Sequence, residues 1–269
     1  MLKRLIAIAI LGTYSAPAEE GLRSGHATAQ WLVASQEDGV IETVVRLRVD
    51  QPWHVYWHNP GEAGMPTSVE LKLPDGWKGS ALKHPIPKKF KTGGLHGFGH
   101  EGTVDYGLTL SAPQGFDGKA ELVAVVSWLT CKDDACIPGE IILKLQTTNG
   151  RVAGPRIEAD AYKVITEQFP IQITPADEVK LKFHEHANQW EFRIENADQL
   201  KLDPDQTEVF VETLELVPAS SVARFMRMAN AWQLSMPKGE YAPQKPDECV
   251  ILLIEKGKQP VRLEWKRGQ

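Results

Sequence analysis

Hydrophobic and polar residues alternate with a period of two along most of the chain, as they do in strands with one buried face. In the first half, the alternating runs cover residues 43–49, 68–73, 104–110, 121–128 and 141–145. Glycine and proline recur between these runs, for example in Asn59-Pro60-Gly61, Gly93-Gly94 and Pro138-Gly139. Short strands between frequent turns predict a β-sandwich for this half of the chain.

The alternation breaks at residues 155–169, where apolar residues recur at helical spacing. These apolar residues are Ile157, Ala161, Val164, Ile165 and Phe169. Pro155 lies near the start of the segment, and Pro170 would end a helix because proline cannot continue one. The segment therefore predicts one short helix that joins two domains.

Period-two runs resume after this helix and predict a second, smaller β-sandwich. The expected strands cover residues 179–184, 189–194, 208–214, 222–228, 232–236, 250–255 and 261–265. The predicted organisation is an all-β chain of two tandem sandwiches. The first domain covers residues 19–152, the helical linker covers 153–170, and the second domain covers 171–269.

Composition and charge narrow the class of protein. Of the 269 residues, 42% are hydrophobic and 24% are charged, which is enough apolar material for a sizeable core. The formal net charge is −5, and no basic tract of five or more residues occurs. The chain therefore lacks the electrostatic pattern of a nucleic-acid-binding protein.

The first residues have the pattern of an export signal. Lys3 and Arg4 precede an apolar run at 5–11, and Ala16-Pro17-Ala18 supplies a small-x-small cleavage pattern. We expect a cleaved signal peptide at 1–18, with an N-terminal core strand as the alternative. No later apolar run approaches the ~18–20 residues that span a bilayer, so we expect an exported mature chain without a transmembrane segment.

Cys131 and Cys136 form the strongest chemical signal in the sequence. One predicted strand leads into the pair and another leads out, so the two thiols should face each other across a hairpin. A disulfide here would close a ring of about six residues, for which loop entropy gives only about 2 kcal/mol. The adjacent Asp133 and Asp134 disfavour a thiolate. The spacing itself leaves a redox role and a structural role equally open.

Other clusters have simpler structural explanations. Five histidines fall between positions 54 and 100, but a strand separates His54 from His58 by about 13 Å, so no metal or other cofactor site is predicted. The aromatic residues Trp53, Tyr56, Trp57 and Trp77 fit a core better than a sugar-binding platform. Cys249 precedes an apolar run and is expected to be a buried, unreactive thiol.

Three ordered motifs carry a resemblance to a known family. They are PWHVYWHNPGEAGMPT at 52–67, PIPKKF at 85–90 with GFGHEG at 97–102, and WLTCKDDACIPGE at 128–140. Together they resemble the periplasmic N-terminal region of the DsbD thiol:disulfide interchange proteins, especially the suppressor-of-copper-sensitivity (ScsB-like) branch. The second half is similar, more weakly, to the additional β-domain of that branch.

The resemblance implies immunoglobulin-like sandwiches and a periplasmic thiol–disulfide relay, with copper tolerance as its physiological context. Cys131 and Cys136 match the redox pair, while Phe98, Tyr56 and His100 would cap and shield it. The implied partners are a membrane electron carrier of the DsbD type and thioredoxin-like periplasmic proteins, because this sequence contains neither a transmembrane domain nor a Cys-x-x-Cys module. The alternative is a non-catalytic periplasmic binding or assembly module with a structural disulfide.

Overall fold

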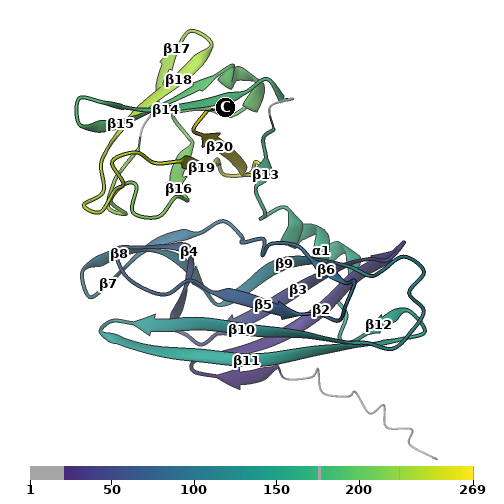
Figure 1. Cartoon of the computed structure of the whole chain (residues 1–269). Coiled ribbons are helices and arrows are strands. Elements are labelled where there is room, and N and C mark those ends of the chain that lie inside the picture. The colour runs from purple at the N-terminus through teal and green to yellow at the C-terminus, as the bar shows by residue number, and fades with distance from the viewer. Residues whose placement is uncertain (1–20, 175–176, 224, 269) are drawn as a thin grey trace, which may run out of the picture.

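The computed structural model describes residues 21–174, 177–223 and 225–268. The expected signal peptide, 1–18, lies outside these residues. Strands form most of the regular structure, and they build two bodies that lie one above the other (Figure 1). None of the helices in the described part of the chain is long and apolar enough to cross a bilayer.

The first body is a sandwich of two sheets. Its first sheet has the order β1-β2-β3-β9-β6, with all neighbours antiparallel. The bounds of these strands are Leu22–Ser24 (β1), Ala27–Glu37 (β2), Val40–Val49 (β3), Thr103–Ser111 (β9) and Lys78–Gly79 (β6).

The second sheet has the order β12-β11-β10-β4-β8-β7, and β5 also pairs with β10. The bounds are Arg151–Ala153 (β12), Ala135–Thr148 (β11), Glu121–Lys132 (β10), His54–Gly61 (β4), Leu95–Glu101 (β8), Lys88–Thr92 (β7) and Ser68–Lys72 (β5). Strand β5 lies along the first half of β10, and β4 pairs with β10 only near its end, at Thr130 and Cys131. Strands β4, β8 and β7 therefore extend the sheet beside the cysteine end of β10.

Alternation along β10 places its apolar side chains in the core of this sandwich. Leu122, Ala124, Val126 and Trp128 are fully buried, while the residues between them are partly exposed. They pack against the inward face of the other sheet, which includes the buried Trp31. The period-two pattern thus positions the strand that ends in Cys131.

The linker contains one helix, α1 (Ala159–Thr166), which is shorter than the predicted segment. Ile165, Ile157 and Phe169 pack against Leu32 and Val44 of the first sheet. The apolar residues that recur at helical spacing in the sequence are therefore the ones that are buried against the first body.

The second body is a smaller sandwich of two four-stranded sheets in the described residues. One sheet has the order β13-β20-β19-β16 and the other has the order β14-β15-β18-β17. The bounds of the first sheet are Ile171–Gln172 (β13), Val261–Lys266 (β20), Glu248–Ile254 (β19) and Glu208–Val211 (β16). Those of the second are Lys180–His186 (β14), Gln189–Glu195 (β15), Ala231–Pro237 (β18) and Met226–Met228 (β17), and a 3-10 helix, η2, covers Ala197–Leu200.

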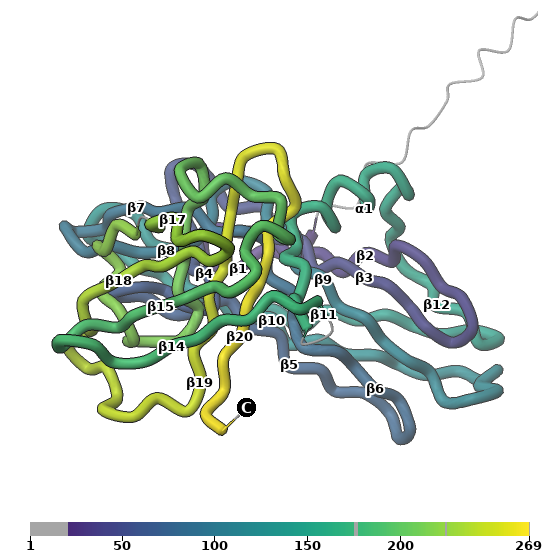
Figure 2. The backbone as a smooth tube through the Cα atoms, turned by 90° about the horizontal axis from the view of Figure 1, so that it is seen from above, coloured from purple at the N-terminus to yellow at the C-terminus, as the bar shows by residue number. Residues whose placement is uncertain are grey.

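The two bodies meet through a small apolar cluster of their own. Trp57 and Phe98 of the first body pack with Phe210, Ala219 and Leu252 of the second. Viewed from above, the second body overlies the end of the first that contains β4, β7 and β8, and the β6 and β12 end projects away from it (Figure 2).

The all-β class with two tandem sandwiches and a short helical linker is confirmed. Among the strands that the sequence pattern missed, β4, β7 and β8 build the site, whereas β2 lies in the other sheet. Residues 54–57 of β4 are buried on both faces, so the sequence does not alternate there. Strand β8 has glycines at positions 97 and 99, and these hide the alternation of hydrophobic and polar residues along the strand.

Candidate redox site

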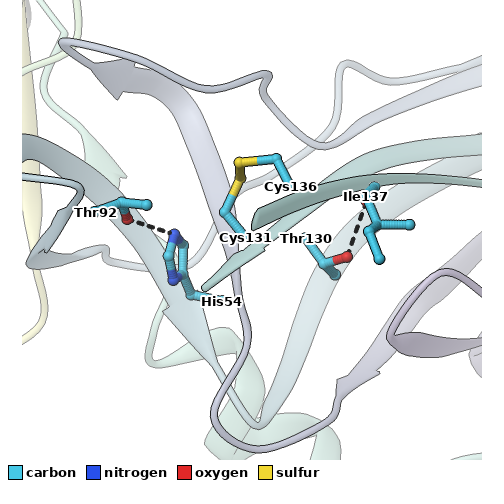
Figure 3. Close-up of a disulfide and its surroundings, with 6 residues drawn as sticks. All are labelled: His54, Thr92, Thr130, Cys131, Cys136 and Ile137. Atoms are coloured by element: carbon cyan, nitrogen blue, oxygen red, sulfur yellow. Dashed lines mark hydrogen bonds between the residues drawn. A yellow bond between two sulfur atoms is a disulfide. The ribbon is translucent and has the colours of Figure 1, made fainter. Parts of the chain in front are cut away.

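The cysteines face each other across a tight β-hairpin. Cys131 of β10 and Cys136 of β11 are direct cross-strand partners, and Lys132 pairs with Ala135 beyond them. Asp133 begins the turn in the left-handed region, with φ 49°. The two cysteines form a disulfide (Figure 3).

The two sulfur-bearing residues differ sharply in exposure. Cys131 is fully buried, whereas Cys136 is exposed. The reason is the sheet order: β10 has β4 on one side and β11 on the other at this point, while β12 pairs with β11 only at the far residues 146–148. The hairpin thus buries one cysteine in the sheet and presents the other to solvent.

Four side chains cover the sheet face beside Cys131. His54 is the cross-strand neighbour of Cys131 on β4, and its Nε2 lies 3.1 Å from the Thr92 hydroxyl of β7 (Figure 3). The Phe90 ring lies 4.0 Å from the His54 ring, and the Tyr56 ring lies 5.2 Å from it. We call His54, Tyr56, Phe90 and Thr92 the covering group.

Glycines let the β7–β8 hairpin seat the Phe90 ring. A Cβ atom at Gly97 or Gly99 would lie 2.7 Å or 2.9 Å from that ring. Gly93 and Gly94 form the turn with positive φ, and a Cβ at Gly93 would be 3.8 Å from the Asp133 carbonyl oxygen. The tip of this hairpin therefore reaches the tip of the cysteine hairpin.

The predicted shielding residues separate onto two faces of the sheet. Tyr56 belongs to the covering group and is buried. Cys131 is in register with His54, and His54 is in register with Glu101. Phe98 and His100 stand at odd steps from Glu101, so they point to the opposite face. The aromatic residue on the disulfide side is Phe90, which sequence reasoning missed.

The contacts of Phe98 agree with this geometry. Its ring lies 5.3 Å from the Phe210 ring and 6.4 Å from the Trp57 ring, in the cluster between the two bodies. The alternation of β7 around Phe90 and its pairing with Gly97 were the signals that could have distinguished the two phenylalanines. Without a register for β7 and β8, both residues fit an aromatic in a glycine-rich hairpin.

His100 lies in a buried cluster of histidines. The rings of His58 and His84 are 4.8 Å apart, and the Tyr106 ring lies between His84 and His100, at 5.3 Å and 6.3 Å. Burial lowers the pKa of His100 to about 3 and that of His84 well below its usual range, and the nearby charge of His58 acts in the same direction. Both side chains are thus neutral at pH 7.

Little around the disulfide stabilises a thiolate. Burial lowers the pKa of His54, and the Glu101 carboxylate only partly opposes this, so the imidazole beside Cys131 carries no positive charge at neutral pH. Lys132 points to the other face, where its ammonium lies 5.6 Å from the Trp53 ring centroid. The strands end in a turn, so no helix N-terminus faces the sulfur atoms.

The other residues that the sequence offered as functional candidates take structural positions. Trp53, Trp57 and Trp77 are all buried. Cys249 lies in the core of the second body, where burial raises the pKa of its thiol well above the usual value. In the described residues, no group of three or more histidine, cysteine or carboxylate side chains has a geometry that would hold a metal ion.

Fold and site together define an immunoglobulin-like β-sandwich that presents a single disulfide at a hairpin tip. Residues 26–147 match the family model described as the N-terminal domain of the thiol:disulfide interchange protein DsbD. The matched part of the chain contains the cysteine hairpin and the whole covering group. The resemblance predicted from the three sequence motifs is confirmed.

A solved structure extends the likeness to the second body. The N-terminal periplasmic domain of ScsB from Proteus mirabilis aligns with a TM-score of 0.64 at 15% identity. The alignment covers 91% of this chain and 94% of that one, so the two share the tandem fold. The chain matches no curated protein sequence.

Proposed function

We propose that this protein relays reducing equivalents in the periplasm by thiol–disulfide exchange at Cys131–Cys136. The observation that carries the proposal is the pairing of an exposed Cys136 with a buried Cys131 at the tip of a hairpin. A partner can reach one sulfur only, which suits ordered exchange through a mixed disulfide. The DsbD-type domain favours a membrane electron carrier as donor and a thioredoxin-like protein as acceptor.

The organisation of the chain follows from the same proposal. A signal peptide at 1–18 would direct export to the periplasm, where disulfides persist. The redox domain would cover 19–152, the linker 153–170 and the second domain 171–269. The separate apolar cores of the two bodies support this division.

In the reducing step, a donor thiolate attacks Sγ of Cys136. The Cys131–Cys136 bond breaks, a donor–Cys136 disulfide forms, and Cys131 leaves as a thiolate that takes up a proton. The second donor thiolate then attacks the donor sulfur of the mixed disulfide and releases Cys136 as a thiolate. The donor is oxidised by two electrons, and the cysteine pair is reduced by two.

In the delivery step, the roles are reversed. The Cys136 thiolate attacks a disulfide sulfur of the acceptor, and the other acceptor sulfur leaves as a thiolate. Cys131 loses its proton and attacks Sγ of Cys136, which restores the disulfide and releases the reduced acceptor. Because nothing nearby favours a thiolate, docking of the partner rather than intrinsic reactivity would provide the specificity.

The covering group would shield Cys131 between encounters, while Cys136 stays exposed. Phe90, rather than Phe98, supplies the aromatic ring on the disulfide face, and Thr92 ties its strand to His54. Tyr56 supports the same face, whereas the orientation of His100 favours a role in the core.

Replacing Phe90 with alanine should speed alkylation of Cys131 by iodoacetamide in the reduced protein. Loss of the ring contacts with His54 and Tyr56 should raise the rate about three- to tenfold, the range expected for losing one or two aromatic pairs. Alkylation under pseudo-first-order conditions, followed by mass spectrometry of the Cys131 peptide, measures the rate. Phe116→Ala is the matched control, because Phe116 packs on Trp77 away from the cysteines. Equal rates for both variants and the wild type would contradict the covering role.

The reduction potential of the pair tests the relay itself. We expect a value above about −300 mV, because structural disulfides of secreted proteins lie below that value. Equilibration against glutathione and dithiothreitol buffers, followed by alkylation and mass spectrometry, measures it. A potential below about −300 mV would instead support a binding or assembly module with a structural bridge.

A further inference from the structure

The β7–β8 hairpin has two faces, and the covering role uses only one of them. On the disulfide face, Phe90 and Thr92 contact His54. On the opposite face, Lys89 and Phe98 are cross-strand partners and point together to the second body. The hairpin is therefore a layer between the disulfide and the second body.

Phe210 of β16 is the centre of the contact on the second face. Its ring lies 5.3 Å from the Phe98 ring and 6.1 Å from the Trp57 ring, both in edge-on geometry. The Lys89 ammonium lies 4.9 Å from the centroid of the Phe210 ring. Phe210 is buried, as are Phe98 and Trp57, so these contacts exclude water.

Polar contacts fix the register of the same boundary. The side-chain amide of Asn59 donates a 2.8 Å hydrogen bond to the carbonyl oxygen of Val211, the residue after Phe210. Asn59 is itself buried. One residue further on, Glu212 accepts a 2.7 Å hydrogen bond from Arg262 and lies 3.6 Å from His58 Nε2. Strand β16 is thus anchored beside β4, which carries the hairpin.

Few backbone hydrogen bonds join the β7–β8 hairpin to the rest of its own domain. Strand β7 is the edge of its sheet. Strand β8 pairs with β4 at Glu101, His100, Gly99 and Gly97, with an irregularity before the last pair, and two hydrogen bonds join His96 to Glu62 just after β4. An edge hairpin with so few ladder contacts has a low free energy of local opening. Packing on its second face therefore has a large influence on how often it opens.

We infer that the second domain holds the β7–β8 hairpin closed over Cys131, the buried half of the disulfide, with Phe210 and Phe98 as the positioning residues that couple the two domains. This inference rests on the proposed function, because it concerns the regulation of access to that site. It gives the second domain a defined role in regulation, since a partner that shifts β16 away from Phe98 would expose Cys131.

The test is Phe210→Ala in the full chain, which leaves every residue of the redox domain unchanged. In the reduced protein, alkylation of Cys131 by iodoacetamide should become about three- to tenfold faster, as expected when aromatic contacts that favour the closed hairpin are lost. The reduction potential should stay at the wild-type value, because the hairpin covers the oxidised and reduced forms alike. Hydrogen exchange of the amides at 88–92 should rise in parallel.

The matched control is Phe183→Ala, which removes a buried ring from the second domain but contacts Trp190, Phe192 and Trp265 rather than the hairpin. The inference is overturned if Phe210→Ala leaves the rate unchanged, or if the control raises it equally. Should Phe210→Ala not fold, Asn59→Ala removes one boundary hydrogen bond and must also increase the rate.

The outcomes separate this inference from the proposed function. Alkylation by iodoacetamide needs no partner, so faster alkylation of Cys131 in Phe210→Ala would support the coupling even if the wild-type potential showed a structural bridge. An unchanged rate together with a potential above about −300 mV would leave the relay standing and remove the coupling.

Discussion

Cys131→Ser should capture partners as mixed disulfides, whereas Cys136→Ser should capture almost none. The first variant keeps the exposed thiol of Cys136, and the second keeps only the buried thiol of Cys131. A buried thiol reacts only after local opening, so we expect its alkylation to be about 100-fold slower or more, which corresponds to an opening cost of at least ~3 kcal/mol. Iodoacetamide kinetics followed by mass spectrometry measure both rates.

The same two variants report on the physiological partners. In periplasmic extract, Cys131→Ser should yield one or two discrete adducts that a reductant reverses. The double variant lacking both cysteines is the control, and it also shows whether Cys249 reacts. Equal alkylation rates for the two single variants would refute the ordered mechanism. If neither variant traps a protein and both only lower the melting temperature, the bridge is structural.

The free energy of unfolding should fall steeply as the pH drops below about 6.5. Burial holds the pKa of His100 at about 3 and that of His84 well below its usual range. In the unfolded chain both side chains bind a proton near pH 6.5, so the unfolded state takes up more protons as the pH falls. Stability is therefore complete above pH 6.5 and is lost progressively toward the folded-state pKa. His100 alone should remove roughly 2 kcal/mol between pH 6.5 and 4.5.

Urea unfolding at pH 7.0, 5.5 and 4.5 measures this loss. His100→Phe should flatten the pH dependence by about the contribution of one histidine, because an apolar ring of similar shape has no proton to bind. His184→Phe is the control, since His184 is an exposed side chain on β14. Parallel pH profiles for the wild type and His100→Phe would contradict the assignment of His100 as a buried neutral group.

Local pattern was enough to predict most of the strands that have one buried and one exposed face, although it missed β2, whose first residues alternate in burial. Alternation identified β10 and β11 and placed Cys131 opposite Cys136 at a hairpin mouth, which the register confirms. It failed for β4, because the layers on both sides of that strand are apolar and its residues do not alternate in burial. It also failed for β7 and β8, because these short strands at the edge of the sheet show no clear alternation of hydrophobic and polar residues.

The sequence by itself determined the two sandwiches, the short helix and the cysteine hairpin, because each follows from residues close together in the chain. Only the tertiary structure decided which cysteine is exposed, since that depends on β4 lying beside β10 and not beside the end of β11. It also decided that Phe90 faces the disulfide while Phe98 faces Phe210. A shift of one residue in the pairing of β8 would exchange these faces, and that register is fixed by strands distant in the sequence.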